Sequence, residues 1–294
     1  MQRSCRSLLV LIFGILTALP AVSQVDLSGE WGQTLHEDQP ERGPGPDIGD
    51  YTALPINDAA RLRGDSWDAN KWAVPEHQCE PHPADYAPRG PGSMTVWSDI
   101  DPYSKAITAW HSLLLWMVPY RTIYMDNRPH PPDYAAHTWQ GFSTGEWEGD
   151  MLKVTTTHLK EGWTRRNGIP RSTKGTLVEY YIRHGDVLTL ASIVRDPGYL
   201  TEPLVRTLNW TLQPGYSPAP SYCVPSKEND NPQGWVAHHL PGTNRWLHEY
   251  SDRYGIPYEA TRGGAEQMYP EYVKKLAKMP RPSPPLTDAP GNRP

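Results

Sequence analysis

Residues 121–160 read RTIYMDNRPHPPDYAAHTWQGFSTGEWEGDMLKVTTTHLK, and this stretch joins a polar loop to a β-hairpin. A short apolar strand, Thr122 to Met125, comes first and a proline-broken loop follows it. The stretch closes with a hairpin that turns at Glu148-Gly149-Asp150, since Gly-Asp pairs between alternating residues favour hairpins. Titratable side chains in an irregular segment between two strands are a common layout for a functional site, because loops carry chemistry while strands fix their ends.

Further strand-like segments lie on both sides of this stretch. They are rich in β-branched and aromatic residues and are bounded by Asp-Pro, Pro-Tyr or Gly-Asp pairs. Gly-Asp-x-Leu occurs at 149–152 and again at 185–188, as expected for repeated hairpins. The sequence therefore predicts an all-β fold: an antiparallel up-and-down β-barrel of about eight strands, with long loop-rich N- and C-terminal extensions. The interior of such a barrel fills with side chains or holds one small ligand.

Two short motifs resemble known families. Gly29-Glu30-Trp31, on the first strand, resembles the start of a lipocalin-type barrel, in which the Trp plugs one end. The pattern W-x-G-x-S-x-G-x-W-E-G-D at 139–150 resembles a motif of exported bacterial proteins with no assigned activity. The second likeness extends over roughly Ser93 to Leu212. It implies an exported β-rich fold and brings no reaction or catalytic residue with it.

Composition divides the chain into five segments. Residues 1–23 have two arginines, an apolar run and small residues at the end, which indicates a cleaved signal peptide. We expect a first strand with a loop-rich excursion at 24–92, the barrel at 93–213, a loop-rich extension packed on it at 214–279, and a disordered Pro-rich tail at 280–294. The predicted location is the periplasm or the exterior, without membrane insertion. The formal charge of −5, with no basic cluster, argues against nucleic acid as a partner.

Two cysteines remain after signal cleavage, Cys79 and Cys223. In an oxidising compartment a pair of cysteines favours one disulfide, and that is our prediction. A catalytic thiol is the alternative. Cys79 also lies between His77 and His82, which would suit a metal, but no second matched cluster is present. We therefore predict no metal, and the absence of phosphate-binding and dinucleotide motifs predicts no cofactor.

The proline-broken loop is the predicted catalytic site. Prolines restrict the backbone around His130, and a carboxylate at Asp126 or Asp133 would orient its imidazole as a general acid or base. Arg128 suits a carboxylate or a developing oxyanion. We expect His137, seven residues on, to point into the same pocket; the alternative is a polar residue that only satisfies its own hydrogen bonds. The structural alternative is a loop whose Asp, Asn and Arg satisfy their own turns.

The substrate-binding wall is predicted from aromatic residues and strand ends near this loop. With 12 Trp and 16 Tyr against 2 Phe, the chain favours half-buried surfaces that meet an amphipathic ligand. His158 and His184 each end a strand, and a barrel brings strand ends together at one rim. The predicted wall is Tyr124, Trp139, Trp147, His158 and His184.

From these residues we expect an exported enzyme that performs cofactor-free acid–base chemistry of the lyase, isomerase, dehydratase or cyclase type. Its substrate would be a small amphipathic or aromatic molecule in a barrel pocket. One alternative is a non-catalytic small-molecule binding protein. Another is a carbohydrate-active hydrolase that uses paired carboxylates, either Asp126 with Asp133 or Glu146 with Glu148.

Overall fold

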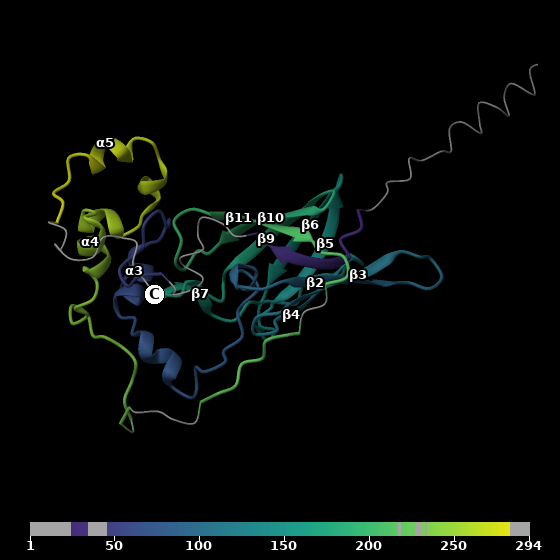
Figure 1. The fold of residues 1–294 in the computed structure, drawn as a ribbon, viewed down its shortest axis with the longest axis horizontal. Helices are drawn as coiled ribbons and strands as arrows, with labels where there is room; N and C mark the ends of the chain where they lie inside the picture. Colours follow the sequence, from purple (N-terminus) through teal and green to yellow (C-terminus); the bar gives the residue numbers. More distant parts are fainter. Residues whose placement is uncertain (1–24, 35–45, 217–218, 227–230, 233, 283–294) are drawn as a thin grey trace, which may run out of the picture.

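The computed structural model describes residues 25–34, 46–216, 219–226, 231–232 and 234–282. The predicted signal peptide and most of the predicted tail lie outside these residues. Within them, nine strands close a barrel, so the predicted β-barrel is confirmed (Figure 1). In chain order the barrel strands are β1 (Gly29–Gln33), β2 (Met94–Ile100), β3 (Ile107–Leu114), β4 (Tyr120–Tyr124), β5 (Phe142–Glu148), β6 (Met151–Thr157), β9 (Thr176–His184), β10 (Val187–Arg195) and β11 (Leu204–Leu212).

Around the wall the order is β1-β11-β10-β9-β6-β5-β4-β3-β2, and β1 closes the ring by pairing with β2 and with β11. The hairpins β5–β6 and β9–β10 turn at the predicted Gly-Asp pairs. The β2–β3 turn is held by Asp101, whose carboxylate accepts hydrogen bonds from the backbone N–H groups of Tyr103 and Ser104. Local turn chemistry thus sets most of the strand connections.

The expected strand count and strand directions need correction. The barrel has nine strands instead of about eight, and it is not antiparallel throughout. Strands β4 and β5 are parallel, with Ile123 opposite Ser143 and Tyr124 opposite Thr144. A tight turn cannot join parallel strands, so the long proline-rich segment 125–141 makes this connection. The predicted site loop is therefore also the one that fixes the direction of β5.

Inward-facing side chains fill the barrel around Trp31, Trp110 and Trp210, which are fully buried together with leucines of β6 and β10. The indole N–H of Trp31 donates to the carbonyl oxygen of Leu27 over 3.0 Å. A void beside Trp110 measures about 10 Å³, roughly the space of a single water. This apolar part of the interior is a packed core and leaves no room for a substrate.

A second core forms where the remaining elements meet the ends of β9, β10 and β11. Leu177, Val194 and Leu204 of those strands pack with apolar residues of the segment 51–60 and with Ile169. Helix α3 (Asp58–Asp65) begins at Asn57, whose side chain accepts a hydrogen bond from the N–H of Ala60. Two further strands, β7 (Gly162–Arg165) and β8 (Ile169–Arg171), pair with each other outside the barrel; the sequence analysis did not anticipate them.

The C-terminal region packs beside these elements, at the end of the molecule away from the β2–β3 hairpin (Figure 1). It consists of α4 (Glu249–Tyr254), η3 (Tyr258–Thr261), η4 (Ala265–Met268) and α5 (Tyr272–Leu276), and the earlier excursion adds η1 (Ala69–Ala73) and η2 (Ala87–Arg89). A backbone hydrogen bond from Tyr51 to Thr261 and another from Gly264 to Leu54 join the two regions. None of the helices among the described residues has the length and apolar character needed to cross a membrane.

Candidate functional site

The predicted loop does not bring Asp126 to His130. Instead, both carboxylate oxygens of Asp126 accept hydrogen bonds from Arg128, at 2.8 Å and 2.5 Å, on the surface. These hydrogen bonds lower the pKa of Asp126 to about 2. The Arg128 guanidinium also lies 3.7 Å from the ring centre of Tyr124. Asp126 and Arg128 thus satisfy each other, while Asp133 is exposed farther along the loop.

His130 lies on the outer face of the barrel, against two threonines. Its Nδ1 is 2.7 Å from the hydroxyl of Thr157, and its Nε2 is 2.9 Å from that of Thr144. The Thr157 hydroxyl is also 2.8 Å from Nδ1 of His158, whose Nε2 is 3.0 Å from the carbonyl oxygen of Pro132. Since a carbonyl only accepts, Nε2 of His158 carries the hydrogen, and Thr157 donates to Nδ1 of His158 while accepting from His130.

His137 completes this arrangement. Its Nδ1 donates to the carbonyl oxygen of Leu159 over 2.9 Å, and its ring centre is 5.2 Å from that of His158. Burial lowers the pKa of His130, and the charge that His158 would carry lowers it further. We term His130, His137 and His158 the histidine clamp, because together they hold segment 125–141 against the end of β6.

The other predicted residues are dispersed. His184 is exposed at the β9–β10 turn, whereas Trp147 is partly buried against the barrel core. Glu146 and Glu148 both bind Lys153, at 2.9 Å and 2.7 Å. Of the four carboxylates proposed for a hydrolase, Asp126, Glu146 and Glu148 are therefore held by cations on the surface.

The predicted disulfide is confirmed: Cys79 and Cys223 are bonded, with their Cα atoms 5.5 Å apart. His77 bonds Glu80 instead of sharing a ligand set with Cys79. Over the residues that the structure describes, no three His, Cys, Asp or Glu side chains gather as a metal site.

A groove of about 480 Å³ opens in the barrel wall between β4 and the start of β5. The two strands pair at two positions only, Ile123 with Ser143 and Tyr124 with Thr144. The residues of β4 that precede Ile123 therefore have no partner strand on this side, and the groove lies there. Apolar and aromatic side chains line most of it, with polar groups at intervals. The lining residues are Pro81, Met117, Val118, Pro119, Tyr120, Arg121, Thr122, Tyr124, Thr138, Trp139, Gln140, Gly141, Phe142 and Ser143. The predicted wall residues Tyr124 and Trp139 are among them.

One wall of the groove is shaped by Gly141, the glycine of the W-x-G motif. Its φ of +66° is in the left-handed region, and a Cβ there would lie 2.5 Å from the carbonyl oxygen of Thr157. Only glycine fits such a position without strain. The wall is then fixed to segment 81–90: Trp139 O accepts from the N–H of Ala84, and Gln140 Nε2 donates to His82 O over 2.7 Å.

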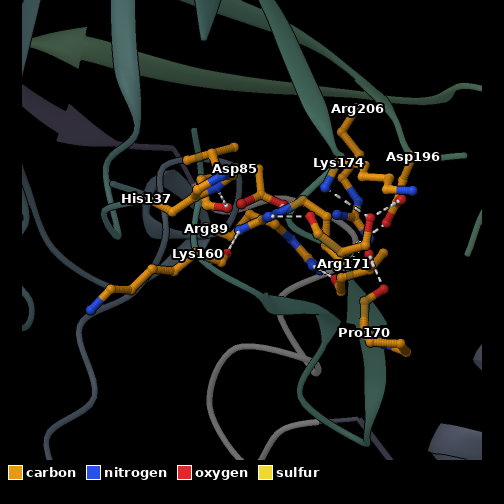
Figure 2. A network of polar contacts seen from close by, with 12 residues as sticks. Asp85, Arg89, His137, Lys160, Pro170, Arg171, Lys174, Asp196 and Arg206 are labelled. Carbon is orange, nitrogen blue, oxygen red and sulfur yellow. Dashed lines mark hydrogen bonds and ion pairs between the residues drawn. The ribbon is translucent and has the colours of Figure 1, made fainter. Parts of the chain in front are cut away.

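Segment 81–90 is itself anchored by a buried ion pair. Nε of Arg171 donates to Asp85 over 3.0 Å, and both side chains are almost fully buried. Figure 2 shows Arg171 at the centre of this network, between Asp85 and the turn that contains Asp196. A second guanidinium nitrogen of Arg171 donates to the carbonyl oxygen of Lys160 over 2.7 Å. The network joins β8 to segment 81–90, and through it to the groove wall.

Arg121 and Ser143 lie at the floor of the groove and are both buried. Arg121 donates to the hydroxyls of Ser143 (3.1 Å) and Thr156 (2.6 Å), and it forms an ion pair with Glu179 at 2.5 Å. Burial alone would lower the pKa of Arg121, but the charge of Glu179 holds it above its ordinary value. The second carboxylate oxygen of Glu179 is buried and has no hydrogen-bond partner among the described residues. The floor is therefore charged but internally neutralised.

A chain of three polar side chains lies beside the groove on the outer face of β2, β3 and β4. Nε2 of His111 is 2.9 Å from the carboxylate of Asp99, and its Nδ1 is 2.6 Å from the hydroxyl of Tyr120. An ionised carboxylate only accepts, so Nε2 carries the hydrogen and Nδ1 accepts from Tyr120. The imidazole is buried against the ring of Trp97, at 5.3 Å between ring centres. Tyr120, in contrast, is 49% exposed and lines the groove.

Asp99, His111 and Tyr120 are not among the residues predicted from the sequence, and they come from three different strands. Their shared outward face follows from the alternation of side chains along a strand, once the register of β2, β3 and β4 is known. The signal that could have found them is a histidine in the middle of a largely apolar strand, ITAWHSLL.

Comparisons with known proteins place no relative beside this chain: no protein-family model matches it, and neither a curated protein nor a solved structure is significantly similar to it.

Proposed function

We propose that this protein is an exported enzyme of the lyase or isomerase type, which performs acid–base chemistry on a small molecule bound in the groove. The observation that carries the proposal is the chain Asp99–His111–Tyr120, whose phenol lines the groove while its imidazole is buried behind it. The confirmed disulfide supports export, because disulfides persist in oxidising compartments. In such a proton transfer, Tyr120 would be the base, His111 the acceptor of its proton, and Asp99 the carboxylate that stabilises the resulting imidazolium.

In the proposed step, the Tyr120 oxygen takes a proton from a C–H or O–H bond of the substrate as its own proton moves to Nδ1 of His111. Asp99 stabilises the imidazolium that forms, and the electron pair left on the substrate drives an elimination or a shift of a double bond. Tyr120 then gives the abstracted proton to the leaving group in an elimination, or to the other end of the shifted double bond in an isomerisation. It recovers its own proton from His111, which returns both residues to their starting forms. A base that is oriented by a carboxylate and lies within hydrogen-bond reach is the usual arrangement for such catalysis.

This proposal keeps the reaction class expected from the sequence and moves it away from His130. The two nitrogens of His130 are occupied by threonine hydroxyls, and Asp126 is occupied by Arg128. His130 then acts as a positioning residue, which holds the groove wall through the histidine clamp. Tyr120 replaces it as the group that meets the substrate.

The test uses 5-nitrobenzisoxazole, an uncharged bicyclic compound whose ring opens when one C–H proton is removed and the N–O bond breaks. The absorbing nitrophenolate product is followed with mature protein, with Tyr120→Phe and with His111→Gln. We expect saturable turnover that falls about 10²-fold or more in both variants. Tyr103→Phe, at a side chain that is 94% exposed, is the matched control and keeps the wild-type rate. A rate no higher than that of free imidazole at equal concentration, or an unchanged rate in Tyr120→Phe, contradicts the proposal.

A further inference from the structure

We infer that the ligand of the groove is an uncharged flat ring whose edge carries a hydrogen-bond donor beside an acceptor, as in lactams and other cyclic amides. The inference rests on the proposed function only in taking the same groove as the site. Three features of the groove support it, namely its aromatic walls, its internal charge balance and the unpaired backbone edge of β4.

The walls favour a ring. Tyr120 and Tyr124 come from one side of the groove, and Trp139 and Phe142 come from the other. Tyr124 and Phe142 have ring centres 5.4 Å apart. Aromatic rings present large flat faces, and ligand sites lined in this way bury most of a ligand's surface. A volume of about 480 Å³ is in the range of sites that hold one drug-sized molecule.

The charge balance favours a neutral ligand. Among the lining residues Arg121 alone is charged, and Glu179 neutralises it at 2.5 Å. An anionic ligand that bound Arg121 in place of Glu179 would leave the Glu179 carboxylate buried and unpaired, which is strongly unfavourable. Two cations lie near the rim: Arg128, which is held by Asp126, and exposed Lys160, which stacks on Trp139 at 5.4 Å. They make an anionic probe a necessary comparison.

The unpaired backbone edge of β4 favours a ligand that carries a hydrogen-bond donor beside an acceptor. Residues 120–122 of β4 pair with β3 on their far side, and their pairing with β5 begins only at Ile123. Across the groove, the N–H and the carbonyl of Thr138 are both bonded to segment 158–160, and the carbonyl of Trp139 accepts from Ala84. The unpaired backbone edge is therefore that of β4. The edge of a cyclic amide presents the same alternation of N–H and C=O as an added strand, so it can pair with such an edge.

The experiment compares three probes of one bicyclic frame. These are 2-quinolinone, a neutral lactam; N-methyl-2-quinolinone, which lacks the donor; and quinoline-2-carboxylate, which is an anion. Ligand-observed NMR titrations against the mature wild type give the dissociation constants, with Phe142→Ala to locate the site and Tyr103→Ala as control. We expect 2-quinolinone to bind about tenfold more tightly than either comparison compound, because each of these loses a hydrogen bond or unpairs a buried charge. Phe142→Ala should weaken its binding and Tyr103→Ala should not.

Equal affinity for the lactam and its N-methyl derivative contradicts the hydrogen bonding of the ligand to the backbone edge of β4. Preference for the carboxylate overturns the charge argument, and no binding by 2-quinolinone, or binding that Phe142→Ala leaves unchanged, overturns the inference as a whole. This inference and the proposed function fail separately. Selective lactam binding without turnover of 5-nitrobenzisoxazole in any form of the protein contradicts the proposed function and leaves the ligand class standing.

Discussion

Tyr120 and Arg121 are consecutive residues of β4, and they meet the groove from opposite faces of the barrel wall. Tyr120 belongs to the outer face, where its hydroxyl bonds His111. Arg121 belongs to the interior, where it binds Glu179 and the hydroxyls of Ser143 and Thr156. The period of two along a strand separates them, and the parting of β4 from β5 lets one groove contact both. A titratable phenol and a neutralised ion pair are thus held in one site by a single strand.

Asp99→Asn should lower turnover of 5-nitrobenzisoxazole without unfolding the protein. An amide side chain cannot stabilise the imidazolium that forms on His111, and it can reverse the orientation of the hydrogen bond. We expect a fall of about 10²-fold or more, measured as kcat at saturating substrate. The far-UV and near-UV circular dichroism should match the wild type, because Asp99 is exposed. An unchanged kcat would show that Asp99 is a surface ligand without a part in proton transfer.

Removal of Glu179 should destabilise the barrel strongly. Glu179→Ala leaves the Arg121 guanidinium buried without its counter-charge, and breaking a buried pair costs about 3–5 kcal/mol. The double variant Arg121→Met with Glu179→Leu removes both charges and should recover more than half of that loss. Urea unfolding followed by tryptophan fluorescence gives both free energies. A double variant as unstable as Glu179→Ala would mean that the pair itself, more than its desolvation, stabilises the fold.

The free energy of unfolding should decrease as the pH is lowered, because His82 is buried. Burial, together with the charge of Arg166, lowers the pKa of His82 to about 4. The unfolded chain, with a histidine pKa near 6.5, therefore binds the proton more readily than the folded one, and stability present above about pH 6.5 is lost between there and pH 4. The loss amounts to about 2–3 kcal/mol. His82→Phe keeps the edge contacts with Tyr86 and Trp163 and should flatten this part of the stability curve.

The disulfide should stabilise the region next to the groove as well as the whole chain. Two residues before Cys223, the N–H of Ser221 donates to Leu115 O, and its carbonyl accepts from Met117, which lines the groove. Cys79→Ala with Cys223→Ala should lower the free energy of unfolding by about 4 kcal/mol, since the bond closes a loop of 144 residues. It should also raise proteolysis near residue 117. Alkylation of unreduced, denatured wild type by iodoacetamide at both positions would contradict the bond.

The sequence predicted the barrel because its hairpins are specified locally. Gly149-Asp150 and Gly185-Asp186 mark turns by residue type alone, and Asp101 supplies its own turn hydrogen bonds. The disulfide followed from the number of cysteines. None of these inferences required knowledge of a contact between distant segments.

The site was not predictable in the same way, because its contacts depend on register. The register of β2 against β3 shifts between Asp99 and Ile100, and such a bulge has no signature in this sequence. Whether Asp99 reaches His111 is settled only by that pairing. Likewise, the prolines around His130 suggested a rigid catalytic loop, whereas their structural setting is the connection between two parallel strands.

The parting of β4 from β5 also determines how this barrel can acquire a different specificity. A barrel that binds its ligand inside has to change its packed core to change its ligand, and each such change affects folding. Here the recognition surface lies at a seam, and one of its sides is a connecting segment whose length and composition can vary without disturbing the other strand pairings. Changes in 125–141 that leave Gly141 and the histidine clamp in place therefore give evolution or an engineer access to new substrates, while the three buried tryptophans stay as they are.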